Sequence, residues 1–191
     1  MSNTVSNVTT GKPAITGAIW RAPLGTTLPT DESATLGTAF KCLGYTSEDG
    51  VTNSNAPSVE TIKAWGGDPV LMPFTERLDT WQWKSIEALN IEVLKMAYGD
   101  SNVTGTSLAT GITVAAGATD QAAAVYVIDT IMTDGAKKRI VIPNGKLTNL
   151  GDIVYKDNDA VGYDVTISAL AGGFTGSNAT HKEYIKRAAS T

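Results

Sequence analysis

The chain has 191 residues and a net charge of −4, with 18% charged and 42% hydrophobic residues. This length fits a single domain. The sequence has no basic run, which argues against a nucleic-acid-binding protein because such proteins present a basic surface to the phosphates. One cysteine, Cys42, excludes an internal disulfide, and with one histidine, His181, it leaves too few ligands for an ordinary zinc site.

The charged fraction is below the usual quarter for a soluble domain. Either other subunits cover part of the surface, or glycine, threonine and alanine take the place of charged residues there, and the composition leaves both interpretations open. The polar N-terminus lacks the apolar stretch of a secretory signal, and no apolar run reaches membrane-spanning length. The sequence therefore predicts a protein that is made in the cytoplasm and stays soluble or assembles there.

The N-terminal part of the chain predicts an arm, a strand and a long connection. Residues 1–12 are rich in Ser, Thr and Asn, which predicts a flexible arm in the isolated subunit. Ala14–Ala22 predicts the first strand of a single β domain that spans residues 13–187, and residues 188–191 form a tail. The turn-rich segment Pro23–Ser33 is long for a loop in a compact domain and predicts a functional or mobile connection.

A hairpin and two further strands are expected next. Gly37–Ser47 predicts a strand, and Glu48-Asp49-Gly50 predicts a turn into a returning strand, Val51–Ser54. Ser58–Ala64 predicts another strand, which ends at Trp65-Gly66-Gly67. Val70–Thr75 can pair beyond that break, and its Pro73 should confine it to a sheet edge or a bulge because proline has no N–H.

The segment Asp79–Ile86 alternates with a period of two, and therefore predicts a strand with Trp81 and Trp83 on one face. A short helix should follow, since Asn90 is a good N-cap and Gly99 a good C-terminal stop. An alternative extends the helix back to Trp83, but it places Asn90 in the helix interior, so we favour strand then helix. The helix has only about two turns and must pack on another element to persist.

The C-terminal half predicts mainly antiparallel β structure, so the fold class is mainly β with one short helix. Ala122–Thr133 is the strongest predicted strand, and Asp134-Gly135 is a hairpin dipeptide. Tyr163–Leu170 alternates apolar and polar residues as a half-buried strand does. The remaining expected elements are short strands at Ser101–Gly105 and Gly111–Ala115, a returning strand at Lys137–Ile142, a turn at Pro143-Asn144-Gly145, a strand at Lys146–Leu150, a linker at Ala171–Thr180 and a last strand at His181–Ile185.

No catalytic, cofactor-binding or metal-binding residues are predicted. His181 has no orienting carboxylate nearby in sequence, which favours a surface or edge-strand histidine. Asp157-Asn158-Asp159 resembles the start of a calcium loop, but Val161 and Ser168 occupy positions where that loop needs ligands, so a polar turn is favoured. The grouped tryptophans could stack on sugars, yet core or subunit contacts are the more common use of such residues. The candidate core or subunit-interface residues are Trp20, Trp65, Trp81, Trp83, Val93, Leu94 and Tyr98.

Several segments, in this order and spacing, resemble the major tail tube proteins of long-tailed, non-contractile bacteriophages, the siphovirus type. The similarity extends over roughly Ile15 to Ile185. The segments that carry it are Gly44–Gly50, Glu60–Asp68, Glu87–Lys95, Arg139–Asn144, Gly151–Tyr155 and Val165–Ile167.

The resemblance implies a β-sandwich or barrel-like domain with one flanking helix. It also implies hexameric rings that stack into a hollow tube for genome passage, with tape measure, tail terminator and distal tail proteins as partners. The protein would be a component of the virion and would have no catalytic residues. Many relatives carry a C-terminal immunoglobulin-like domain, and none is expected in this chain.

The physical features are compatible with such assembly. Stacking would order the mobile segments and cover exposed strand edges, and a neutral or acidic inner wall would let DNA pass without binding. Two alternatives remain: a carbohydrate- or small-molecule-binding β-sandwich, and an inner tube of a contractile tail or a type VI secretion apparatus.

Overall fold

The computed structural model describes residues 3–15, 17–118, 120–133 and 135–187, and its main feature is one antiparallel sheet. Within this part of the chain the sheet has nine strands, with the order β3-β2-β12-β13-β14-β9-β4, while β1 pairs with β12 and β15 with β13. The bounds are β1 Gly11–Pro13, β2 Ile19–Pro23, β3 Lys41–Cys42, β4 Thr46–Ser54, β9 Thr80–Ser85, β12 Ala124–Met132, β13 Lys137–Leu150, β14 Tyr163–Ala169 and β15 Lys182–Lys186.

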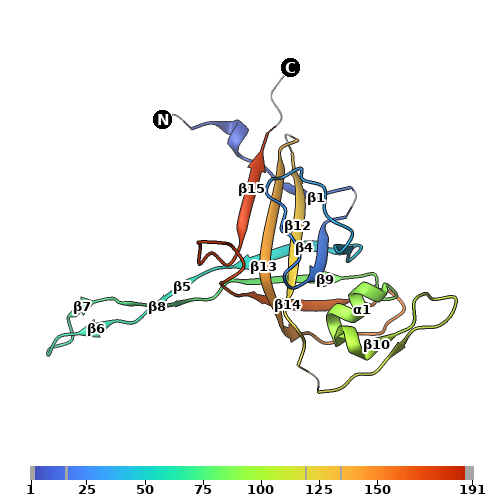
Figure 1. Ribbon diagram of the computed structural model, residues 1–191. Coiled ribbons are helices and arrows are strands. Elements are labelled where there is room, and N and C mark those ends of the chain that lie inside the picture. Colours follow the sequence, from blue (N-terminus) through green and yellow to red (C-terminus); the bar gives the residue numbers. More distant parts are fainter. Residues whose placement is uncertain (1–2, 16, 119, 134, 188–191) are drawn as a thin grey trace.

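The remaining elements project from this sheet or cover it (Figure 1). The β-rich class with one short helix is confirmed, and none of the described helices is long and apolar enough to cross a membrane. Their bounds are η1 Val5–Asn7, β5 Pro57–Val59, β6 Ile62–Lys63, β7 Pro69–Leu71, β8 Phe74–Arg77, α1 Ile91–Tyr98, η2 Asp100–Asn102, β10 Val103–Thr104 and β11 Thr113–Val114.

The β12–β13 hairpin is the centre of the fold. Five consecutive residues of β12, from Ala124 to Ile128, are buried, because the strand has a hydrophobic cluster on each of its faces. On one face Tyr126 and Ile128 pack with the tryptophans of β9 and with α1. The hairpin between the two strands is confirmed, with Gly135 at φ 79°, while Asp134 lies outside the described residues.

The expected turn at Pro143-Asn144-Gly145 is wrong, because β13 is continuous from Lys137 to Leu150. The proline lies where β13 changes partner: Val141 is the last residue paired with β15, and Gly145 is the first paired with β14. A residue without an N–H is tolerated in a strand at such a gap. On the β12 side the register shifts at the same level, so the segment forms a bulge instead of a reversal.

The expected hairpin at Glu48-Asp49-Gly50 is also wrong. β4 is a single strand along β9, with Thr46 opposite Ser85 and Val51 opposite Trp83, so the extra residues form a bulge. Gly50 has φ 71°, and it uses its freedom at positive φ to return the chain to the same strand direction. A polar Glu48-Asp49-Gly50 segment between two strand-like runs has the same sequence pattern whether it forms a turn or a bulge.

The strand and helix around Trp83 agree with the expectation, and the alternative of one longer helix is wrong. Trp81 and Trp83 lie on the buried face of β9. The Asn90 side chain accepts a hydrogen bond from the Glu92 backbone N–H at 3.0 Å. Gly99 ends α1 with φ 97°, and a Lys95–Glu92 ion pair of 3.3 Å lies on the helix surface.

The connection after β2 covers the second hydrophobic cluster. Leu28, Leu36 and Phe40 pack there against the outer face of β12 and β13. Leu28, in the segment that stacking was expected to order, therefore already has packing contacts within one chain. The predicted strands at both ends are also shorter than expected: the first begins at Ile19, after Gly17 at φ 127°, and β3 has two residues.

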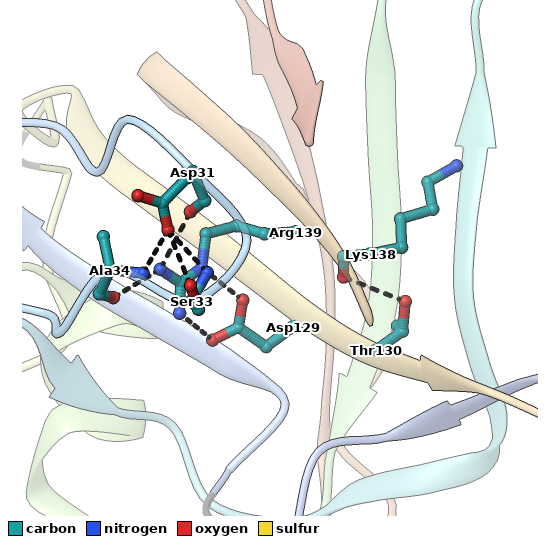
Figure 2. Close-up of polar contacts among 7 residues, drawn as sticks. All are labelled: Asp31, Ser33, Ala34, Asp129, Thr130, Lys138 and Arg139. Atoms are coloured by element: carbon teal, nitrogen blue, oxygen red, sulfur yellow. Dashed lines mark hydrogen bonds and ion pairs between the residues drawn. The ribbon is translucent and has the colours of Figure 1, made fainter. Parts of the chain in front are cut away.

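Arg139 ties this connection to the sheet (Figure 2). Its guanidinium pairs with Asp129 at 2.7 Å, and its Nη1 donates to the backbone carbonyl of Ala34 at 2.6 Å. The Asp31 side chain in turn accepts hydrogen bonds from the backbone N–H groups of Ser33 and Ala34, which lowers the pKa of that carboxyl. The buried arginine thus replaces the backbone partners that an irregular segment lacks.

Candidate assembly surface

A long hairpin projects from the sheet between β4 and β9, and we name residues 55–78 the arm (Figure 1). Its two sides pair in two steps, β5 with β8 and β6 with β7. The sequence predicted strands on either side of Trp65 but not their pairing with each other. At the tip Gly66 and Gly67 have φ values of 120° and 101°, which only glycine adopts readily. Pro73 lies between β7 and β8 and interrupts the ladder, as its missing N–H predicts.

The arm exposes its apolar side chains on all sides. Trp65 at the tip has a relative exposure of 107%, so it makes no burying contact in the single chain. Contiguous exposed apolar surface on a soluble protein usually marks an interaction site. The other large hydrophobic side chains exposed on the arm are Val59, Ile62, Val70, Leu71, Met72, Phe74 and Leu78.

The base of the arm is fixed by a buried carboxylate. Asp79 has a relative exposure of 3% and accepts hydrogen bonds from Asn53 at 2.7 Å, from Thr180 and from His181. Burial raises the pKa of the Asp79 carboxyl, but the hydrogen bonds from His181, Thr180 and Asn53 outweigh burial and leave it below its ordinary value. The charged carboxylate therefore stabilises the joint between the arm and the body.

The expectation for His181 needs correction. Its side chain is only 16% exposed, and its ring lies edge-on to Trp81 at 5.2 Å between centroids. The orienting carboxylate is Asp79, 102 residues away in sequence, and no local pattern could have revealed it. The ring is thus a packed structural group at the start of β15.

An apolar groove of about 980 Å³ lies beside α1. Its walls come from the residues before α1, from the β10–β11 hairpin and from the loop before β14. Tyr163 at the groove is largely buried, which raises its pKa to about 12, and Tyr98 packs edge-on against it at 5.9 Å. The apolar residues that shape the groove include Leu89, Leu94, Leu108, Ile112 and Tyr155.

The candidate residues from the sequence do not form one surface. Trp81, Trp83, Val93 and Leu94 lie in the core, Trp20 and Tyr98 are half-buried, and Trp65 alone is fully exposed. No stacking platform of several tryptophans exists in the described chain. Sequence analysis missed the other exposed apolar residues of the arm, although the paired runs on either side of Gly66-Gly67 were a usable signal.

The other polar candidates are structural. Asp159 pairs with Lys156 at 3.1 Å and with Lys84 at 3.8 Å, so its carboxylate already has cationic partners. Within residues 3–15, 17–118, 120–133 and 135–187, no group of three His, Cys, Asp or Glu side chains could hold a metal ion. Cys42 is half-buried.

Free strand edges accompany the arm. Strands β1, β3, β4 and β15 each pair with one neighbouring strand of the described sheet, so each presents unpaired backbone groups. Such edges can pair with another chain. Together with the arm and the groove, they are the surfaces through which copies could associate.

Comparison with known protein families gives one match of nearly full length. The family model described as "Phage tail tube protein" matches residues 5–187. No curated protein matches the sequence. The matched range includes the arm, the groove and the free strand edges.

Proposed function

The chain belongs to the phage tail tube protein family, and from this we propose that its copies assemble into hexameric rings that stack around a channel for the phage genome. As a member of this family it is a structural protein of the virion tail and not an enzyme. The proposal concerns the form of the assembly and its partners.

The exposed apolar arm is the observation that carries the proposal. An element with this much apolar surface is unfavourable in water, and burying it against other copies would remove that cost. A surface that meets a different surface of the next copy makes a heterologous contact, which produces either a closed ring or an open filament. In a tube of stacked rings, one heterologous contact closes each ring and another repeats from ring to ring along the filament.

We further propose the long-tailed, non-contractile tail type, on the resemblance of segments such as Gly44–Gly50 and Glu60–Asp68. Its other partners would be the tape measure, tail terminator and distal tail proteins. The excess of acidic over basic residues, 19 against 15, supports a channel wall that does not bind DNA.

Electron microscopy and sedimentation of the purified protein at increasing concentration test the assembly. We expect rings or tubes, with a smallest closed species of six 20.0-kDa chains, about 120 kDa. The same experiment with a distal tail protein added should lower the concentration at which tubes appear. Discrete monomers at high concentration, with and without that partner, would overturn the proposal.

A further inference from the structure

We propose that Trp65 at the arm tip of one copy docks in the apolar groove beside α1 of the next copy. This inference rests on the proposed self-assembly, and it names the two surfaces that meet. Trp65 is fully exposed in the single chain, whereas the groove is open and lined mainly by apolar side chains. An exposed indole and an open apolar groove are complementary in chemistry.

The groove is built to receive an apolar group. Leu89, Leu108 and Tyr155 line it with relative exposures of 68%, 60% and 75%, so large apolar areas are still uncovered there. Leu94 and Tyr163 form its buried floor. A bulky side chain that enters would displace water from these groups without moving the core.

The arm cannot fill the groove of its own chain. Figure 1 shows the arm extending away from the body on one side, while α1 and β10 lie on the opposite side. The base of the arm is fixed by the buried Asp79, which opposes a fold-back. The occupant is therefore a second copy, and the contact is head to tail.

The available area is sufficient for a stable contact. Trp65 and Phe74 each offer roughly 150–250 Å² of surface for burial. With the six other exposed apolar side chains, the arm presents on the order of 800 Å², which is the share of one partner in a standard stable interface. The groove would cover the tip, and the surrounding body would cover the rest of the arm.

One charged pair is available between the two surfaces. Lys63 is exposed two residues before Trp65, and Glu87 is the charged residue that lines the groove. Neither takes part in an ion pair among the described residues, although the Glu87 carboxylate accepts hydrogen bonds from the Tyr45 backbone N–H and from Asn90 Nδ2. Docking of Trp65 would bring the lysine toward the carboxylate side of the groove.

Cysteine cross-linking between different copies tests the docking. In a Cys42→Ala background, copies with Ala64→Cys, which keep Trp65, are mixed with copies that carry Leu108→Cys, assembled and oxidised. We expect disulfide-linked dimers from this mixture and at least tenfold fewer from a control mixture in which Thr27→Cys, an exposed position in the loop after β2, replaces Leu108→Cys. Equal yields from both mixtures, or tubes without cross-links at position 108, would overturn the docking and leave the tube function standing.

A second variant provides the test if the Ala64→Cys copies do not assemble. Ala160 is exposed and lines the groove, so Ala160→Trp should fill the groove without disturbing the core. We expect the concentration needed for assembly to rise at least tenfold, with an unchanged melting temperature. Assembly of Ala160→Trp as in the wild type would overturn the docking. If the wild type itself forms no rings or tubes, the proposed function fails and this inference with it.

Discussion

The Nδ1 atom of His181 lies 2.6 Å from Oδ2 of Asp79, although 102 residues separate them in sequence. Asp79 lies where the arm joins β9, and His181 directly precedes β15. The contact therefore fixes the base of the projecting arm to the C-terminal strand.

Asp79→Ala should destabilise the protein by about 3 kcal/mol, because it leaves the side-chain donors of Asn53, Thr180 and His181 without their buried acceptor. Urea unfolding followed by tryptophan fluorescence measures the loss. Asp68→Ala is the matched control, since Asp68 is exposed on the arm and should change stability by less than about 0.5 kcal/mol. Equal effects of the two substitutions would contradict the role of the buried carboxylate.

The Asp79 carboxylate should also make the free energy of unfolding depend on pH in the acidic range. Burial raises the pKa of Asp79, but its three hydrogen bonds hold it below the ordinary 3.8. A carboxyl with a lower pKa in the folded than in the unfolded state stabilises the fold above the unfolded value, and this contribution disappears as the pH falls through the folded value. The difference in unfolding free energy between the wild type and Asp79→Asn should therefore be constant near neutral pH and shrink below about pH 4. A difference that stays constant down to pH 2 would contradict this.

Arg139→Met should release the segment between β2 and β3 from the sheet. The substitution removes the ion pair with Asp129 and the hydrogen bond to the Ala34 carbonyl, at an expected cost of about 3 kcal/mol. Hydrogen exchange should rise in residues 24–40 while the β12–β13 hairpin stays protected. Lys138→Met is the control, because its ion pair with Glu183 is more exposed and should contribute under about 1 kcal/mol.

Gly145→Ala should also destabilise the sheet, by about 1–3 kcal/mol. A Cβ at this position would lie 2.7 Å from the Tyr126 ring and 3.2 Å from Ile167, so the core would have to shift. Gly37→Ala is the control, since a Cβ there meets nothing within 4 Å and should be neutral or slightly stabilising. Thermal unfolding of both variants measures the difference, and a stable Gly145→Ala would show that the bulge in β13 can absorb a methyl group.

Local signals predicted the elements whose geometry is set by neighbouring residues. The Trp81–Trp83 alternation, the Asn90 cap and the Gly99 stop are of this kind, and the structure has them as expected. The errors at Gly50 and Pro143 have a common cause. A glycine or proline interrupts a ladder in the same way in a turn and in a bulge, and only the partner strands decide between the two.

Contacts over long sequence separations could not be predicted. The pairing of Asp79 with His181 and of Arg139 with Ala34 depends on which strands become neighbours. The exposure of the arm was missed for a related reason. Its apolar runs match the pattern of core strands, and its projection from the body follows from the topology and not from its own residues.

Trp65→Ala should separate assembly from folding. The side chain is fully exposed in the single chain, so its removal should change the free energy of unfolding by less than about 0.5 kcal/mol. An interface tryptophan commonly contributes 2 kcal/mol or more, so the concentration needed for assembly should rise about thirtyfold or more. Sedimentation and electron microscopy measure this, with Trp65→Phe expected to recover part of the loss and Leu24→Ala, an exposed leucine outside the arm, as the control. If Trp65→Ala assembled like the wild type while Leu24→Ala did not, the surface that joins the copies would lie near β2 and not on the arm.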